Sequence, residues 1–136
     1  MRFLLDTHAF LWFISGDSDL SDYARRLVEN PANERYLSVA SLWEVAIKTS
    51  LGKLDLGQSM ADLVRDHVQG NAIELLGIEP NHLDVVAGLP FRHKDPFDRL
   101  IVAQSLAEGM PVISRDSVFD EYGVSRIWKG LPLSPS

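Results

Sequence analysis

Short apolar runs alternate with longer segments of helical periodicity along the whole chain. The runs indicate strands over residues 3–5, 35–39, 72–78, 111–113 and 124–128. They are mostly continuous rather than alternating with polar residues, which is typical of strands covered on both faces. Strands separated by helices require crossover connections. The sequence therefore predicts an α/β fold built on a mainly parallel central sheet.

The segments between these runs indicate helices over residues 7–15, 22–30, 42–50, 59–69, 81–88 and 96–108. The clearest is 96–108, because Asp95 is a good N-cap, Pro96 suits the first helical position and Gly109 follows the end. We expect Ser41 to cap the helix over 42–50, where Ser41 and Glu44 form the S-x-x-E pattern of a capping box.

Length and composition limit the kind of protein. A chain of 136 residues fits one domain, and the absence of cysteine removes disulfides and thiolate metal ligands. The net charge of -6 argues against a passive nucleic-acid binder, which usually carries a basic patch. No stretch approaches the roughly 20 apolar residues of a membrane span, so we expect a cytoplasmic location.

Four acidic residues from distant parts of the chain fall on one edge of the predicted sheet. Asp6 directly follows the first strand, and Asp116 lies three residues after the fourth. Glu44 and Asp98 are expected in the first turns of helices that start near the same edge. Sites in parallel sheets form just beyond the carboxyl ends of the strands. The topology therefore predicts an acid cluster made of Asp6, Glu44, Asp98 and Asp116.

A divalent cation would relieve the repulsion among these carboxylates. Ligands that are all oxygen favour Mg²⁺ or Mn²⁺. Such an ion polarises a phosphate and lowers the pKa of a water that then attacks phosphorus. The acid cluster therefore predicts a metal-dependent nuclease, a reading that the acidic composition does not exclude.

Each acid also has a simpler structural interpretation. Asp98 can be a helix-start residue that favours the helix dipole. Glu44 can pair with Ser41 in the capping box, or with Lys48 one turn later. Asp116 can cap a short turn over residues 117–122, and Asp6 can cap the first helix. Taken singly, the acids leave the structural and functional interpretations open.

The motifs that contain the four acids resemble those of PIN-domain ribonucleases. They are MRFLLDTH at residues 1–8, SLWE at 41–44, HKDPFDRLI at 93–101 and VISRD at 112–116. Each motif is short, but their order and spacing are specific. The resemblance is strongest to VapC-type toxins of bacterial toxin–antitoxin pairs, and it extends from Met1 to about Trp128.

The resemblance implies a three-layer α/β/α sandwich over residues 1–128, followed by a C-terminal tail over 129–136. It implies hydrolysis of RNA with Mg²⁺ or Mn²⁺, inhibition by a cognate antitoxin protein and assembly as a homodimer. By matching motifs, the metal-binding and catalytic acids are Asp6, Glu44, Asp98 and Asp116. Thr7 and Ser114 match hydroxyl positions that steady the acids or bind water, and Asp95 is a secondary acid.

Basic residues and histidines add weaker expectations. Arg92, Lys94 and Arg99 form the only local basic cluster near an acidic motif. With His93, they are candidates to bind the RNA backbone or an acidic antitoxin segment, and a solvated loop is the alternative. His93 is either a contact to phosphate or a loop residue near the site. His82 is expected at the surface.

Two other functions compete with the ribonuclease interpretation. A non-catalytic RNA-binding or assembly module on the same fold gains nothing from negative charge that faces phosphate. An aspartyl-phosphate phosphatase would need a D-x-D pair after the first strand, where this chain has Asp6-Thr7-His8. The chain also contains no G-x-x-x-x-G-K-[ST] loop for a nucleoside triphosphate.

Overall fold

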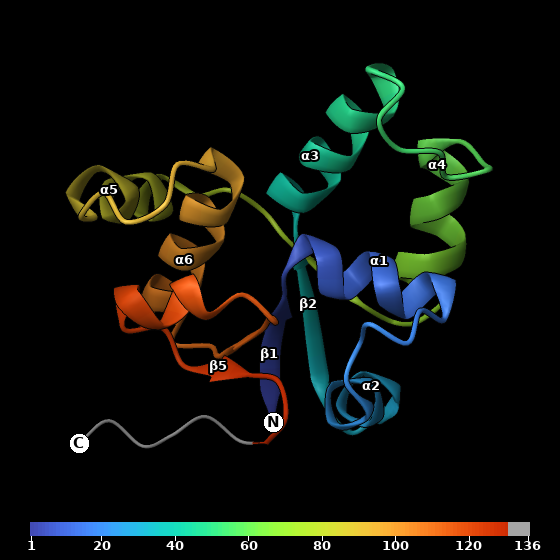
Figure 1. The fold of residues 1–136 in the computed structure, drawn as a ribbon, viewed down its shortest axis with the longest axis horizontal. Helices are drawn as coiled ribbons and strands as arrows, with labels where there is room; N and C mark the ends of the chain where they lie inside the picture. The colour runs from blue at the N-terminus through green and yellow to red at the C-terminus, as the bar shows by residue number, and fades with distance from the viewer. Residues whose placement is uncertain (131–136) are drawn as a thin grey trace.

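The computed structural model describes residues 1–130 and contains one five-stranded sheet (Figure 1). The strands are β1 (Arg2–Leu5), β2 (Glu34–Ser38), β3 (Glu74–Leu76), β4 (Val112–Ile113) and β5 (Arg126–Ile127). All neighbouring strands are parallel, in the order β3-β2-β1-β4-β5. The α/β fold with a parallel sheet is confirmed, and each predicted strand is present.

The register aligns the carboxyl ends of the three central strands. Leu5 at the end of β1 lies opposite Leu37 of β2 on one side and Ile113 of β4 on the other. The chain builds β2 and β3 outward from β1 in one direction, then returns to build β4 and β5 in the other. The boundary between β1 and β4 is therefore the topological switch point, where such sheets usually carry their sites.

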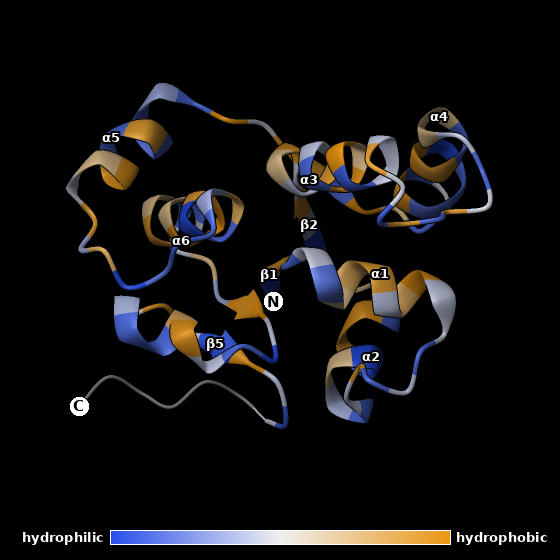
Figure 2. Ribbon diagram, turned by 45° about the horizontal axis from the view of Figure 1, so that its top comes forward, coloured by the Kyte–Doolittle hydropathy of each residue, from blue (hydrophilic) through white to orange (hydrophobic). Residues whose placement is uncertain are grey.

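Helices cover both faces of the sheet (Figure 1). One layer contains α1 (Thr7–Ser15), α2 (Asp22–Glu29), α4 (Met60–Leu63) and the π-helical turn η1 (Val64–Gln69). The other contains α5 (Pro80–Gly88), α6 (Pro96–Glu108) and the 3₁₀ helix η2 (Ser117–Tyr122). The remaining helix, α3 (Val39–Ser50), contacts both α1 and α6. Figure 2 shows hydrophobic and hydrophilic stretches on α1, α3 and α6, as expected of helices with one face on the core.

The apolar run of β1 is continuous because each face of the strand meets a separate core. Phe3 and Leu5 pack with α1 and α2, whereas Leu4 packs with α6 and η2. All three side chains are fully buried. Burial of a side chain of this size stabilises the fold by about 1.5–3 kcal/mol. The central strand thus holds the two helical layers together and fixes the position of the residue that follows it.

The start of α6 agrees with its sequence signals. Asp95 is the N-cap, and its Oδ1 accepts hydrogen bonds from the backbone N–H groups of Phe97 (2.8 Å) and Asp98 (3.3 Å). Pro96 occupies the first turn, and Gly109 ends the helix in a left-handed conformation. Asp98 is therefore held in the first turn of α6, as predicted.

The predicted start of the helix after β2 is wrong. The helix α3 begins at Val39, and Ser38 is the N-cap, whose hydroxyl accepts from the backbone N–H of Ala40 at 3.0 Å. Ser41 is buried inside the helix, where its hydroxyl accepts a hydrogen bond from the Thr7 hydroxyl at 2.9 Å. The capping box with Ser41 is thus absent. Glu44 lies in the second turn of α3, not in the first.

The predicted tail over residues 129–136 lies mostly outside the described residues, which end at Gly130. Within residues 1–130, none of the helices combines the length and the apolar character that a membrane crossing requires.

Candidate metal centre

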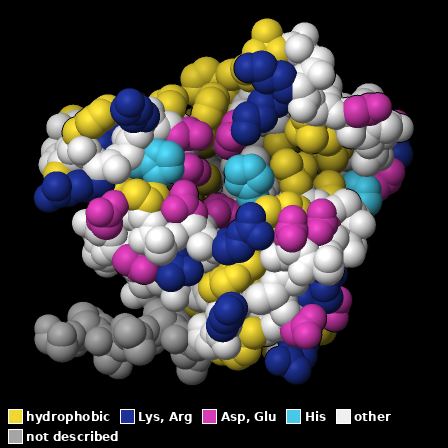
Figure 3. All heavy atoms as spheres, in the orientation of Figure 1, with side chains coloured by type: hydrophobic (Ala, Val, Ile, Leu, Met, Phe, Trp, Pro, Cys, Tyr) yellow, Lys and Arg dark blue, Asp and Glu magenta, His cyan; other side chains and the backbone are white. Residues whose placement is uncertain are grey.

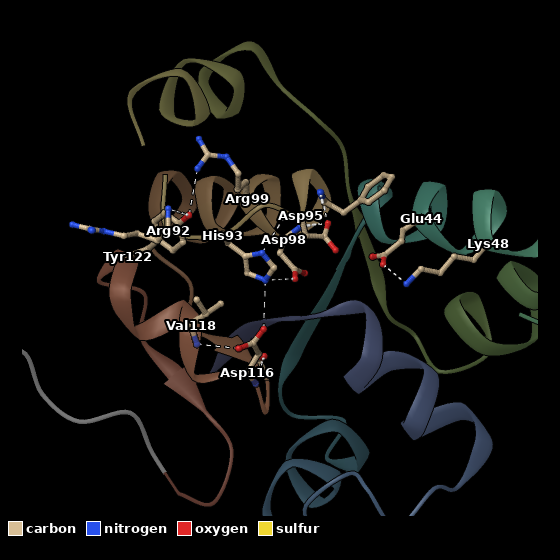
Figure 4. Close-up of polar contacts among 12 residues, drawn as sticks. Glu44, Lys48, Arg92, His93, Asp95, Asp98, Arg99, Asp116, Val118 and Tyr122 are labelled. Atoms are coloured by element: carbon tan, nitrogen blue, oxygen red, sulfur yellow. Dashed lines mark hydrogen bonds and ion pairs between the residues drawn. The ribbon is translucent and has the colours of Figure 1, made fainter. Parts of the chain in front are cut away.

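The carboxyl edge of β1 and β4 brings the four predicted acids to one place. Asp6 follows β1 directly, and Asp116 lies in the loop between β4 and η2. Glu44 approaches from α3 and Asp98 from the first turn of α6. Figure 3 shows acidic side chains gathered in a hollow of this face, between histidine side chains. Figure 4 shows the carboxylates of Glu44, Asp95 and Asp98 directed toward one another from α3 and α6.

Asp6 is a buried acid directly after the central strand. It is only 5% exposed, and its Oδ1 accepts a hydrogen bond from the backbone N–H of Ala9 at 2.8 Å. Burial raises the pKa of the Asp6 carboxyl, and hydrogen bonds from Ser114 and Ala9 partly offset this rise. The capping role foreseen for Asp6 is present, and it fixes one oxygen of the carboxylate.

The Asp98 carboxyl interacts electrostatically with every other acid of the cluster. Burial, and after it the negative charges of Asp95, Asp6, Glu44 and Asp116, together raise the pKa of this carboxyl to about 8. Charges perturb one another in this way only when they are near in space. The acids that the sequence places far apart therefore form one electrostatic unit around Asp98.

Glu44 is buried with one oxygen unmatched. Its Oε2 forms an ion pair with Lys48 Nζ at 2.7 Å, so the pairing one turn apart along the helix is present. The contact with Glu44 is the main reason that the pKa of the Lys48 ammonium is raised. Glu44 Oε1 is buried and has no hydrogen-bond partner among residues 1–130. A buried carboxylate oxygen without a donor is costly, so this atom points to a missing positive ligand.

Asp116 sits at the rim of the hollow and caps the next helix. Its Oδ1 accepts a hydrogen bond from the backbone N–H of Val118 at 3.0 Å, at the start of η2. About half of the side chain is exposed. The capping interpretation of Asp116 is therefore correct, and the same bond holds its carboxylate at the edge of the cluster.

His93 lies between two of the acids (Figure 4). Its Nε2 is 3.0 Å from Asp98 Oδ2 and 3.5 Å from Asp116 Oδ2. Its Nδ1 accepts a hydrogen bond from the backbone N–H of Asp95 at 3.0 Å. The potential ligand atoms of His93, Asp98 and Asp116 all lie within 4.8 Å of one another. The sequence left the role of His93 open, whereas the fold places it inside the acid site.

The chemistry of the donor set fits a hard divalent cation. Donors of the protein already engage one oxygen of each acid: Ala9 on Asp6, Lys48 on Glu44, His93 on Asp98 and Val118 on Asp116. These contacts orient the carboxylates without neutralising the cluster. Glu44 Oε1 has no hydrogen-bond donor among residues 1–130, and the charges of four neighbouring acids add to the burial that raises the pKa of Asp98. Mg²⁺ or Mn²⁺ would offset this negative charge.

The three secondary residues have different surroundings. Ser114 is fully buried, and its hydroxyl accepts from the backbone N–H of Asp116 while it also hydrogen-bonds the Asp6 carboxyl. Ser114 thus links two acids of the cluster. Thr7 instead donates to Ser41, which joins α1 to α3. Asp95 caps α6 and contributes charge beside Asp98.

The basic residues near the third acidic motif do not act as one group. Arg99 Nη1 donates to the carbonyl of Pro90 at 3.0 Å, and the guanidinium lies over the Phe91 ring. These contacts fasten the loop before α6, so Arg99 already has a structural role. The side chains of Arg92 and Lys94 are exposed.

Sequence reasoning overlooked the aromatic and cationic wall beside Asp6 and Asp116. A hollow of about 300 Å³ is lined by those two acids with His8, Trp12 and Arg115. The Arg115 guanidinium lies 4.5 Å from the centre of the Trp12 ring system. The spacing of His8 and Trp12, four residues apart on one helix, was the available signal, because such pairs share a face.

The sequence also misplaced His82, which is fully buried rather than at the surface.

Comparisons with known structures find the same architecture in proteins of low sequence identity. The chain is similar to VapBC2 from Rickettsia felis bound to a promoter DNA fragment, with 17% identity over 90% of this chain and 93% of the other and a TM-score of 0.63. FitAB bound to IR36 DNA is 19% identical over 93% and 94%, with a TM-score of 0.66. A toxin–antitoxin complex from Klebsiella pneumoniae is 18% identical over 85% and 87%, with a TM-score of 0.55. No curated protein sequence matches the chain.

The fold and the acid cluster define an α/β domain with an acidic site at the carboxyl edge of its parallel sheet. The sequence profile of the PIN domain matches residues 3–124, which is most of the chain. The protein therefore belongs to the PIN domain family, as its motifs indicated.

Proposed function

We propose that this protein is a divalent-metal-dependent endoribonuclease. The observation that carries the proposal is the buried, unpartnered Oε1 of Glu44 within an acid cluster where burial and the neighbouring charges raise the pKa of Asp98 to about 8. RNA is proposed as the substrate because the acidic motifs resemble those of PIN-domain ribonucleases, and the chain belongs to the PIN domain family. Asp6, Glu44, Asp98 and Asp116 are the proposed metal-binding and catalytic residues.

The residues of the site have separate roles toward the phosphodiester bond. A bound Mg²⁺ or Mn²⁺ supplies positive charge at the phosphate and lowers the pKa of a water. Asp6, directly after β1, and Asp98, in the first turn of α6, would bind such an ion through their carboxylate oxygens. Lys48 donates to Glu44 Oε2 and orients that carboxylate, and the Val118 N–H keeps Asp116 at the rim. Arg92 and Lys94 are exposed cations that suit contact with the RNA backbone.

The test is cleavage of RNA by the purified protein with excess chelator and after addition of Mn²⁺ or Mg²⁺. We expect no cleavage in chelator and recovery with metal. Glu44→Gln should lower cleavage by orders of magnitude, because removing a metal-binding carboxylate removes the positioned ion. Asp84→Asn is the matched control, since Asp84 is an exposed acid on α5. Full activity in chelator contradicts the metal-dependent mechanism.

A toxin of a type II toxin–antitoxin pair is the cellular role that we propose. An antitoxin Arg or Lys inserted beside Asp6 and Asp116 would compete with metal, and the hollow of about 300 Å³ has room for such a side chain. RNA as substrate and an antitoxin as partner imply action in the cytoplasm. A small DNA-binding protein encoded beside this gene should co-purify with the chain and suppress cleavage. A neighbouring gene product that does neither contradicts the toxin role.

We also propose that the chain forms a homodimer. Exposed apolar side chains lie on α3, in and just after β3, and on α5: Val39, Trp43, Leu75, Ile78 and Leu83. Large exposed apolar groups of this kind mark interaction surfaces. Light scattering should give the mass of two chains, and Leu83→Arg should shift it toward one chain. A monomer at all concentrations contradicts this part of the proposal.

A further inference from the structure

The ring of His93 connects three parts of the acid site. It contacts the backbone of Asp95 through Nδ1 and the carboxylates of Asp98 and Asp116 through Nε2. Its distances to the two carboxylates alone would suit a metal ligand. We propose instead that His93 is a positioning residue that donates a hydrogen bond from Nε2–H to the acids and does not coordinate the metal.

The role of His93 depends on which of its two ring nitrogens carries the proton. A backbone N–H is always a donor, so the Nδ1 that faces the N–H of Asp95 at 3.0 Å must be the acceptor. A neutral imidazole has one N–H, which is then on Nε2. That proton points at Asp98 Oδ2, 3.0 Å away, with Asp116 Oδ2 at 3.5 Å. The lone pair that a metal would need on Nε2 is therefore absent.

Coordination through Nε2 would require the other tautomer. Its proton on Nδ1 would then face the N–H of Asp95, and two donors would oppose each other. The Asp95 N–H cannot easily turn away, because Asp95 is the N-cap of α6 and its own side chain is fixed by Phe97 and Asp98. The start of α6 thus fixes the tautomer of His93.

This arrangement explains how two acids from different elements keep one orientation. Asp98 belongs to α6 and Asp116 to the loop after β4, and His93 is the side chain that contacts both. With His93 as a donor, the proposed metal ligands remain all oxygen, which favours Mg²⁺ or Mn²⁺ over Zn²⁺. The role of His93 toward metal rests on the proposed function, whereas its tautomer does not.

The tautomer can be read directly by NMR of the full chain labelled with ¹⁵N at histidine. We expect His93 to carry its proton on Nε2 without metal and to keep it there at saturating Mg²⁺. His82 is an internal reference, because its Nδ1 also accepts a backbone N–H, that of Glu79, at 3.0 Å. His82 contacts Glu108, about 15 Å along α6 from Asp98, and should not respond to Mg²⁺. A proton on Nδ1 of His93, with or without Mg²⁺, overturns the proposal.

Metal binding by variants gives a second, independent readout. His93→Ala should weaken binding of Mg²⁺ and Zn²⁺ by similar factors, about 10- to 100-fold, as loss of an outer hydrogen bond does. His93→Gln, which retains an N–H donor, should recover part of the loss. His67→Ala is the control, since His67 lies on η1 and is not among the residues of the acid cluster. A much larger loss for Zn²⁺ than for Mg²⁺, with no recovery by Gln, identifies His93 as a ligand and refutes the donor role.

These measurements separate the two proposals. If the tautomer and the metal affinities behave as expected but no RNA is cleaved in any metal, the ribonuclease function fails and the role of His93 stands. If RNA is cleaved but the ring proton lies on Nδ1, the role of His93 fails and the ribonuclease function stands.

Discussion

Raising the pH should destabilise the metal-free protein through Asp98. The pKa of this carboxyl is about 8 in the folded protein, against an ordinary value of 3.8 that applies to the unfolded chain. The folded state therefore holds a proton that the unfolded state has lost. The stability from this proton is fully present below the unfolded pKa and is lost as pH rises through about 8. Linkage gives a loss of roughly 2 kcal/mol between about pH 6 and about pH 8.

The assay is urea unfolding in chelator at both pH values, for the parent and for Asp98→Asn. The variant contains the same histidines but has no carboxyl proton at this position, so the difference between the two proteins isolates Asp98. We expect the parent to lose more stability than the variant by roughly 2 kcal/mol over the interval.

Metal should reverse the effect, because it binds the ionised carboxylate. Calorimetry should show that Mg²⁺ binding releases a proton below about pH 8, and that the affinity rises about tenfold for each pH unit toward that value. Equal pH dependence of stability in the parent and in Asp98→Asn would refute the reasoning, as would an affinity for Mg²⁺ that is constant with pH.

Three further substitutions test individual contacts. Asp116→Asn keeps the cap on Val118, since Asn caps about as well as Asp. Without metal, the melting temperature of the variant should equal or slightly exceed that of the parent, and the increase in melting temperature on adding Mn²⁺ should be much smaller. An equal increase with intact RNA cleavage would leave Asp116 as a cap alone. Lys48→Met should lower the free energy of unfolding by about 1 kcal/mol in chelator, because buried Glu44 loses its cation. The loss should be smaller in Mg²⁺. Equal losses with and without Mg²⁺ in urea titrations would contradict a metal site at Glu44. Arg99→Ala should lower the free energy of unfolding by about 1–2 kcal/mol, because the loop before α6 is released. An unchanged urea midpoint would argue against this structural role of Arg99.

Local sequence signals were sufficient for most of the fold. The run Phe3-Leu4-Leu5 identified a strand buried on both faces, and both of its faces do meet a core. Asp95, Pro96 and Gly109 defined the helix between them to the residue. These signals are reliable because they involve residues within a few positions of one another, where the backbone itself sets the geometry.

The same local reasoning failed where two equivalent residues competed. Ser38 and Ser41 are both good N-caps, and the sequence favoured Ser41 because of Glu44 three positions later. The structure uses Ser38, and the Ser41 hydroxyl instead accepts from Thr7, 34 positions away in the chain. A contact of that range leaves no trace in local periodicity.

The acid cluster divides in the same way between sequence and structure. The order of strands and acids in the sequence predicted that Asp6, Glu44, Asp98 and Asp116 would meet at one edge of the sheet. The tertiary structure alone decided the partners of each acid, including His93 on Asp98, the buried oxygen of Glu44 and the use of Arg99 in the loop. The physical reason is that capping and periodicity depend on neighbours along the chain, whereas burial and hydrogen-bond partners depend on which distant segments the completed sheet brings together.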